Sequence, residues 1–216
     1  MMKKAYIAEA IGSFLLVAVV VGSGIMGASL SSGNDAIALL GNTIATSAIL
    51  FVIIKMFGAV SGAHFNPAVS LVFYIRNELK FIDLILFTVF QISAGMIAIF
   101  CIHYIFQIEL FQISQNIRGD WPLLASEIIA TSGLILTILL IRKHDNSSVA
   151  TGVALFIAAG YWFTSSTSFA NPAVTISRMF TDTFTGIAPV SVPFFICGQL
   201  IGCVIGSYIF CIFDKD

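Results

Sequence analysis

Charged residues are scarce in this 216-residue sequence, since Asp, Glu, Lys and Arg together make up only 10% of it. A typical soluble domain carries about 25%. Hydrophobic residues make up 58% of the chain, and the mean hydropathy is +1.01. A folded surface in water needs more polar cover than this, so the composition excludes a soluble enzyme and a disordered chain. The net charge of −1 offers no basic surface to a phosphate backbone, which excludes a nucleic-acid binder.

Cysteine is also rare. The four cysteines lie in apolar runs and form neither a CxxC pair nor the spaced framework of a secreted protein. This pattern is typical of packing residues rather than of disulfides or metal ligands. His103 and His144 have no ligand partner at useful spacing. We therefore expect no metal and no cofactor.

Long apolar runs dominate the chain, and a membrane helix needs about 20 such residues. The runs predict six membrane-spanning helices near residues 5–28, 36–57, 81–105, 121–141, 148–166 and 190–212. Two further apolar segments, Gly58–Ile75 and Thr167–Thr181, are each interrupted by Asn-Pro and are not expected to span. The predicted fold class is an all-α membrane protein with six transmembrane helices plus two re-entrant half-helices.

Lysine and arginine indicate the orientation, because cytoplasmic loops of membrane proteins carry an excess of them. With the N-terminus inside, eight of these residues fall on the cytoplasmic side and two fall outside. The inside set is Lys3, Lys4, Lys55, Arg76, Lys80, Arg142, Lys143 and Lys215, and the outside set is Arg118 and Arg178. We expect a multi-pass protein of the inner (plasma) membrane with both termini cytoplasmic.

The two halves of the sequence resemble each other. The matched elements, in the same order in each half, are Glu9 with Glu127, Asn66–Leu71 with Asn171–Ile176, and Gln91 with Gln199. Three spans separate equivalent points, so the second half is inverted, and inverted repeats place the functional site at the midplane between them. We expect one channel domain over residues 1–216, with halves 1–108 and 121–216 joined by an external loop, 109–120.

The Asn-Pro-Ala at each break is typical of a helix start. Proline is favoured at the first helical position, and asparagine is favoured just before it as the N-cap. Asn66-Pro67-Ala68 and Asn171-Pro172-Ala173 therefore each predict a short helix. Pro67–Ile75 is nine residues long, or about 14 Å, which is roughly half of a ~30 Å hydrocarbon core. Two such half-helices, entering from opposite faces, would meet at the middle of the membrane.

The backbone that leads to each half-helix is expected to be non-helical, which is tolerated at membrane depth only when it is buried or lines a water-filled cavity. Its carbonyls would form a ladder of acceptors, and the amide donors of the two cap asparagines would face the lumen. Two helix N-termini would repel cations there. The pattern predicts a passive channel for small uncharged molecules, with no enzymatic step. The predicted ladder residues are Gly62, Ala63, His64, Thr167 and Phe169.

These residues resemble the major intrinsic protein family, the aquaporins and aquaglyceroporins, over the whole chain. The resemblance rests on the Glu and Gln of each half, on Ser61–Val69 (SGAHFNPAV) and on the second Asn-Pro-Ala. It implies six spans, two re-entrant half-helices, a pore in each subunit and a homotetramer in the lipid bilayer.

One position departs from the family pattern. Most members have an arginine directly after the second Asn-Pro-Ala, and here that residue is Val174. By equivalent spacing, the other constriction positions are Thr46, Ala159 or its neighbour Gly160, and Ser168. All are small and uncharged, which predicts a wide constriction. The pattern is similar to bacterial members associated with arsenic-resistance genes, which implies arsenite or methylated arsenicals as candidate solutes beside glycerol and water.

Several ionisable residues leave alternatives open. Arg178 either lines the outer vestibule or pairs with Asp182 at i,i+4, and the pair is favoured. Glu9 and Glu127 either support the re-entrant loops, which is favoured, or serve as the proton relay of a transporter. His64 either packs within its loop, which is favoured, or acts as a pH gate. The competing functions are an ordinary water or glycerol channel, a proton-coupled transporter and a non-conducting structural membrane protein.

Overall fold

The computed structural model describes residues 2–214, so Lys215 of the predicted cytoplasmic set lies outside the described residues. Within that range the chain is helical and contains no strand. The α-helices are α1 (Met2–Leu30), α2 (Asp35–Ser61), α3 (Pro67–Ile75), α4 (Phe81–Ile105), α5 (Trp121–His144), α6 (Val149–Phe163), α7 (Pro172–Arg178) and α8 (Val192–Phe213). Two 3-10 turns, η1 (Asn146–Ser148) and η2 (Pro189–Ser191), precede α6 and α8.

The predicted all-α membrane fold is confirmed. Among the described residues, five helices are long and apolar enough to cross a membrane, namely α1, α2, α4, α5 and α8 with its preceding turn. The sixth predicted span, 148–166, is the shorter helix α6 of 15 residues. It ends early because Thr164 adopts extended backbone, and its hydroxyl donates to the Gly160 carbonyl at 2.6 Å.

Local sequence signals set the helix ends. Asn34 caps α2 by accepting from the backbone N–H groups of Ala36 and Ile37. Gly62, at φ 87°, ends α2 in the left-handed conformation that glycine adopts without steric cost. Asp120 caps α5 by accepting from Leu123 N–H at 2.9 Å.

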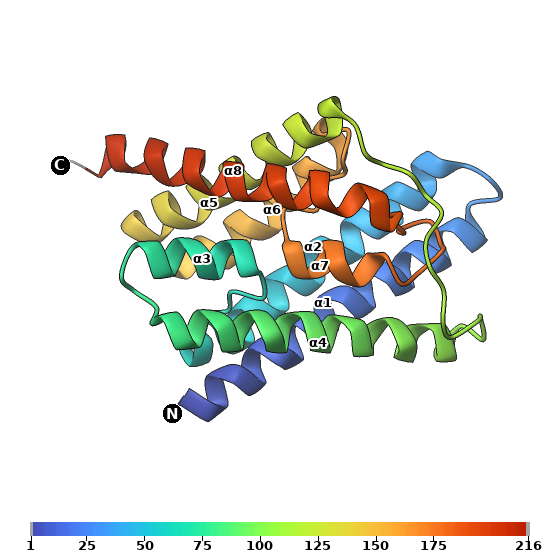
Figure 1. The fold of residues 1–216 in the computed structure, drawn as a ribbon, viewed down its shortest axis with the longest axis horizontal. Coiled ribbons are helices and arrows are strands. Elements are labelled where there is room, and N and C mark those ends of the chain that lie inside the picture. Colours follow the sequence, from blue (N-terminus) through green and yellow to red (C-terminus); the bar gives the residue numbers. More distant parts are fainter. Residues whose placement is uncertain (1, 215–216) are drawn as a thin grey trace.

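Helices from both halves of the chain surround the two short helices. In the first half α1 packs against α2 and α4, in the second α5 packs against α6 and α8, and α2 packs against α6 between them. The half-helices α3 and α7 each contact α4 and α8, and they also contact each other. Figure 1 shows the first turn of α1 and the last turn of α8 at the same end of the bundle. The two short helices therefore lie inside the bundle.

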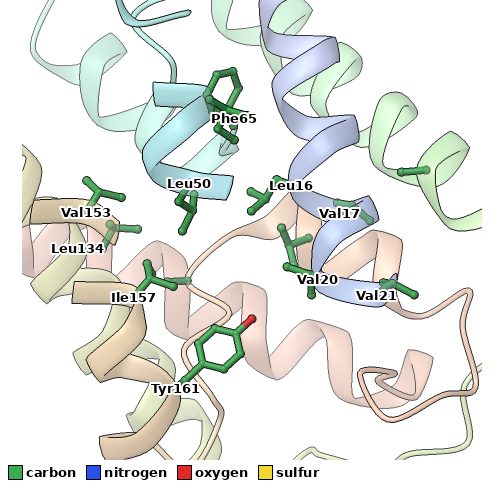
Figure 2. Packing of buried hydrophobic residues seen from close by; sticks show 14 of the residues in the cluster. Leu16, Val17, Val20, Val21, Leu50, Phe65, Leu134, Val153, Ile157 and Tyr161 are labelled. Atoms are coloured by element: carbon green, nitrogen blue, oxygen red, sulfur yellow. The ribbon is translucent and has the colours of Figure 1, made fainter. Parts of the chain in front are cut away.

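Buried apolar side chains from α1, α2, α5 and α6 converge on the interior of the bundle. Figure 2 shows Leu16 and Val20 of α1, Leu50 of α2, Leu134 of α5, and Val153, Ile157 and Tyr161 of α6 facing a common space. The same seven side chains line a central cavity. On the outside, large apolar side chains such as Ile44, Leu155, Val204 and Tyr208 are exposed, as a surface in contact with lipid requires.

Candidate functional site

Glu9, buried in α1, holds the segment that leads to α3. Its Oε1 accepts from the hydroxyl of Ser61 at 2.6 Å and from His64 N–H at 2.9 Å. Its Oε2 accepts from Phe65 N–H at 2.6 Å and from the amide of Gln91 at 2.8 Å. Four donors thus surround one carboxylate, which offsets the cost of burying it.

Glu127 of α5 makes the equivalent set of contacts in the second half. Its Oε1 accepts from the hydroxyl of Ser166 at 2.6 Å and from Phe169 N–H at 3.0 Å. Its Oε2 accepts from Ala170 N–H at 2.8 Å and from the amide of Gln199 at 2.7 Å. Both predicted loop-supporting carboxylates therefore contact the backbone just before an Asn-Pro-Ala.

These contacts hold backbone that most residues avoid. In the first loop Ala63 and Phe65 have φ of 53° and 46°, and in the second Ser168 and Ala170 have φ of 50° and 45°. Non-glycine residues rarely occupy this left-handed region. The carboxylates bind the N–H groups at or next to these residues, so the strained loops are fixed by side chains from α1 and α5.

The two cap asparagines hold the half-helices tip to tip. Asn66 Oδ1 accepts from Ala68 N–H at 2.9 Å, and Asn171 Oδ1 accepts from Ala173 N–H at 3.0 Å. Each amide nitrogen donates across the gap, from Asn66 to the Ala170 carbonyl at 2.7 Å and from Asn171 to the Phe65 carbonyl at 2.8 Å. The expectation that both amide donors are free is therefore wrong, because one hydrogen of each amide joins the loops and one remains.

Three cavities follow one another through the bundle. The central cavity, about 90 Å³, is lined by both cap asparagines. It shares Gly62 and His64 with a larger cavity of about 500 Å³ at the Lys55 end. It shares Arg178 with a cavity of about 450 Å³ at the opposite end. The cavity at the Asn-Pro-Ala motifs is therefore the smallest of these three.

The predicted ladder residues divide between these cavities. Gly62, Ala63, His64 and Phe169 line the central cavity, and Thr167 lines the cavity at the Arg178 end. The carbonyls of Phe65 and Ala170, which the sequence analysis did not single out, are the ones that accept from the asparagines.

Three of the predicted constriction residues, Thr46, Ser168 and Val174, line the central cavity. Ala159 does not, because it lies on the exposed face of α6. Gly160 is buried, and a Cβ there would lie 2.6 Å from the hydroxyl of Ser168, so it makes room for the loop.

The α6 residues at the cavity are instead Ile157 and Tyr161, which repeat at the i,i+4 spacing of one helix face. Tyr161 donates to the hydroxyl of Thr46 at 3.2 Å. Tyr161 was not among the predicted site residues, although Val149, Val153, Ile157 and Tyr161 repeat every four residues in the sequence.

The favoured pairing of Arg178 with Asp182 is wrong. Arg178 Nε donates to the Thr185 carbonyl, and the guanidinium carbon lies 3.5 Å from the ring centroid of Phe169. Asp182 instead accepts from Gln115 N–H at 2.8 Å. The intervening turn after α7 directs the two side chains apart. Arg178 lines the cavity of about 450 Å³, which we call the vestibule.

His64 is buried in its loop. Its Nδ1 lies 3.0 Å from the Ser70 hydroxyl, and its ring lies 4.5 Å from that of Phe73. Among residues 2–214, no three His, Cys, Asp or Glu side chains gather where they could hold a metal ion.

Comparisons with known proteins point to one family. The model of the major intrinsic protein family matches residues 1–148. The chain is 45% identical to aquaglyceroporin AqpS of Rhizobium meliloti (strain 1021), over 92% of this chain and 84% of that protein. It is 27% identical to aquaporin NIP2-3 of Zea mays, over 96% of this chain and 68% of that protein. The X-ray structure of the aquaglyceroporin from Plasmodium falciparum has the same fold, with a TM-score of 0.72 at 23% identity over 100% of this chain and 96% of that one.

Proposed function

Because this chain belongs to the major intrinsic protein family and is a multi-pass membrane channel rather than an enzyme, we propose that its pore passes small neutral solutes bulkier than glycerol as well as water and glycerol. The observation that carries this proposal is Val174, which lines the central cavity at the position where the family resemblance leads us to expect an arginine. The side chain there is short and uncharged, so it neither narrows the pore nor binds a solute oxygen.

The neighbours of Val174 support the same proposal. Thr46 and Ser168 are small and uncharged, and both line the central cavity, so neither narrows it with a bulky side chain. The apolar side chains of Leu50 and Ile157 make up much of the remaining wall. A pore of this kind suits compact neutral molecules with several hydroxyl groups, and arsenite and methylated arsenicals are the candidate solutes.

The contacts of Glu9 and Glu127 distinguish between a passive channel and a proton-coupled transporter. All four oxygens of Glu9 and Glu127 accept from two donors each, and none of the eight donors is a titratable group. A proton relay needs an acceptor that exchanges protons with the lumen, and neither carboxylate lines the central cavity. The geometry therefore favours a loop-supporting role and passive flux.

The test is a stopped-flow panel on purified protein in vesicles, with water, glycerol, urea, arsenite and methylarsenite as solutes. We expect flux of all five that follows each gradient and does not saturate. Val174→Arg should lower the flux of methylarsenite more than that of water, and Val174→Thr, which keeps the size of the side chain, should change the fluxes little. A pore that passes water alone would contradict the proposal, and flux driven by a proton gradient would favour the transporter.

We further propose a homotetramer in the inner membrane with both termini cytoplasmic. The same-end placement of the first turn of α1 and the last turn of α8 supports the common side of the termini (Figure 1). The excess of Lys and Arg at that end supports the cytoplasmic assignment. Cross-linking in the native membrane and accessibility of cysteines added at each terminus test the two statements separately.

A further inference from the structure

Two arginines from different parts of the chain meet at the ring of Phe169, beside the vestibule. Arg178 ends α7, and Arg118 lies in the loop between α4 and α5. Their guanidinium carbons lie 3.5 Å and 5.1 Å from the centroid of the Phe169 ring, within the range of cation–π attraction. Both residues line the cavity at this end of the pore.

Hydrogen bonds fix both guanidinium groups in place. Arg118 donates to the Ser166 carbonyl at 3.0 Å and lies 3.5 Å from the Thr167 hydroxyl. The backbone of Arg118 is also held, because its N–H donates to the Ser191 hydroxyl at 2.8 Å. Arg178 donates through Nε to Thr185. These acceptors are all uncharged, so the bonds orient the two cations without neutralising them.

Neither cation has a carboxylate partner in the described part of the chain. The ion pairs within 4.0 Å there involve Arg76, Arg142 and Lys143, all at the other end of the molecule. Asp35 lines the same vestibule, but its carboxylate lies beyond ion-pair distance of both guanidiniums. The buried charge of Arg178 and the half-buried charge of Arg118 together create a positive potential at this end of the pore.

Arg178 also stands where the vestibule meets the central cavity, since it lines both. It is 4% exposed, and no protein acceptor in residues 2–214 binds its two terminal nitrogens. Val174 and Arg178 lie four residues apart on α7, on the same face of the helix. The backbone of Arg178 is therefore displaced outward by about one turn, or roughly 5.4 Å, from that of Val174, while its guanidinium reaches the ring of Phe169 at the central cavity.

We propose that Arg178, positioned together with Arg118 on the ring of Phe169, is the cation-excluding filter of this channel. Arg178 follows Val174 by one helical turn, and its side chain lies where the central cavity opens into the larger vestibule. A monovalent cation that approaches from this side meets two positive charges before it reaches the asparagines. A neutral polyhydroxy solute instead meets the free N–H groups of Arg178, which donate to its oxygens.

This placement separates two properties of the pore. Charge rejection acts over several ångströms and does not require a narrow passage, whereas sieving by size requires side chains in contact with the solute. With Arg178 at the boundary between the two cavities and Val174 within the central one, the channel rejects cations without an arginine at position 174. The inference rests on the proposed pore, because it assigns the filter of that same path.

The test measures K⁺ and glycerol fluxes in parallel in proteoliposomes. Arg178→Met keeps the length of the side chain and removes its charge, and we expect K⁺ flux to rise about tenfold above wild type while glycerol flux persists. Arg118→Met should raise K⁺ flux less, because its guanidinium lies farther from the ring and outside the central cavity. Arg178→Lys, which keeps the charge, should remain closed to K⁺.

The matched control is Arg76→Met, which removes an arginine that lines none of the three pore cavities and packs over Phe210 at the opposite end. It should leave both fluxes as in the wild type. The double variant Val174→Arg with Arg178→Met moves the arginine to the position directly after the second Asn-Pro-Ala. It should restore K⁺ exclusion and lower the flux of methylarsenite.

Folded Arg178→Met and Arg118→Met proteins that conduct glycerol and exclude K⁺ as well as the wild type would overturn the proposal. Should Arg178→Met not assemble, Arg178→Gln and Arg118→Met decide in the same way, and unchanged K⁺ exclusion in both again overturns it. A wild-type protein that conducts no neutral solute would instead refute the pore itself, so the two failures are distinguishable.

Discussion

Asn66 and Asn171 exchange hydrogen bonds with each other's loops, since each donates its amide to the carbonyl of the residue that precedes the other, at 2.7 and 2.8 Å. Each also accepts from its own helix through Oδ1. One amide therefore caps a helix and ties together two segments that are remote in the sequence. A carboxylate can perform the first of these tasks but not the second.

Asn66→Asp tests this double role. The carboxylate keeps the cap, but it loses the donated bond and faces the Ala170 carbonyl with a negative charge. We expect the free energy of unfolding to fall by about 1–3 kcal/mol, the cost of leaving a buried group unpaired, and glycerol flux to drop. Thermal unfolding of the purified protein and stopped-flow swelling measure the two effects.

Asn34→Asp is the matched control for that substitution. Asn34 caps α2 and only accepts hydrogen bonds, from Ala36 and Ile37 at 3.1 and 3.2 Å. Aspartate is as good an N-cap as asparagine, so stability and flux should stay near wild type. Equal losses in the two variants would show that the donated amide bond contributes nothing.

Glu9→Gln tests the carboxylate that holds the first loop. Glutamine has one oxygen where Glu9 has two, and its NH₂ group would face donors such as Phe65 N–H and the amide of Gln91. Each lost bond to a charged acceptor costs about 1.5–3 kcal/mol. We expect a lower unfolding temperature and less functional protein in vesicles, and the flux that remains should be independent of a proton gradient.

Glu109→Gln is the control, because Glu109 is exposed in the loop after α4. It should leave unfolding temperature and flux unchanged. A Glu9→Gln protein of normal stability whose flux had lost a dependence on the proton gradient would contradict the loop-supporting role and favour the transporter.

Much of the fold follows from local sequence signals. Helix α3 begins at the predicted Pro67 and ends at the predicted Ile75, because a proline, a capping asparagine and the apolar period are all local features. Five of the six predicted spans follow from hydropathy in the same way. The end of α6 was less predictable, because the turn at Thr164 depends on the loop that follows and not on the apolar run.

The wall of the pore was harder to predict, because it depends on the rotation of each helix. Equivalent spacing placed Ala159 at the constriction, whereas α6 turns Tyr161 toward the cavity and Ala159 outward. Successive side chains on an α-helix point about 100° apart. Counting residues from a motif in another segment therefore does not determine which side chain faces the pore. Arg118 lies in a loop with no periodic pattern, and only the three-dimensional structure brings it to Phe169.

A pH-dependent cluster of ion pairs lies at the opposite end of the pore. Glu78, in the turn between α3 and α4, pairs with Arg76 at 3.0 Å and with Arg142 at the end of α5. Partial burial raises the pKa of this carboxyl, but the two arginines outweigh burial and hold the pKa below its ordinary value. Because the folded pKa is the lower one, the stabilisation is present above the unfolded pKa and is lost as the pH falls through the folded value.

We therefore expect the unfolding temperature of the wild type to decline on acidification below about pH 4.3, the ordinary glutamate pKa, more steeply than that of Glu78→Gln. Thermal unfolding across a pH series measures the difference between the two proteins. Parallel curves for wild type and Glu78→Gln would show that the pair with Arg142 does not stabilise the folded state.

Adjacent positions on α6 give the sharpest test of how that helix faces the pore. Gly160 packs against the second loop, where an added Cβ would lie 2.6 Å from the Ser168 hydroxyl, whereas Ala159 faces outward. Gly160→Val should displace Ser168 and its strained backbone, lower stability by about 1–3 kcal/mol through overpacking and reduce glycerol flux. Ala159→Val adds similar bulk to the outer surface and should change stability by less than about 0.5 kcal/mol. If instead Ala159→Val blocks solute flux while Gly160→Val leaves it intact, α6 is rotated relative to this structure, and Tyr161 is not part of the pore wall.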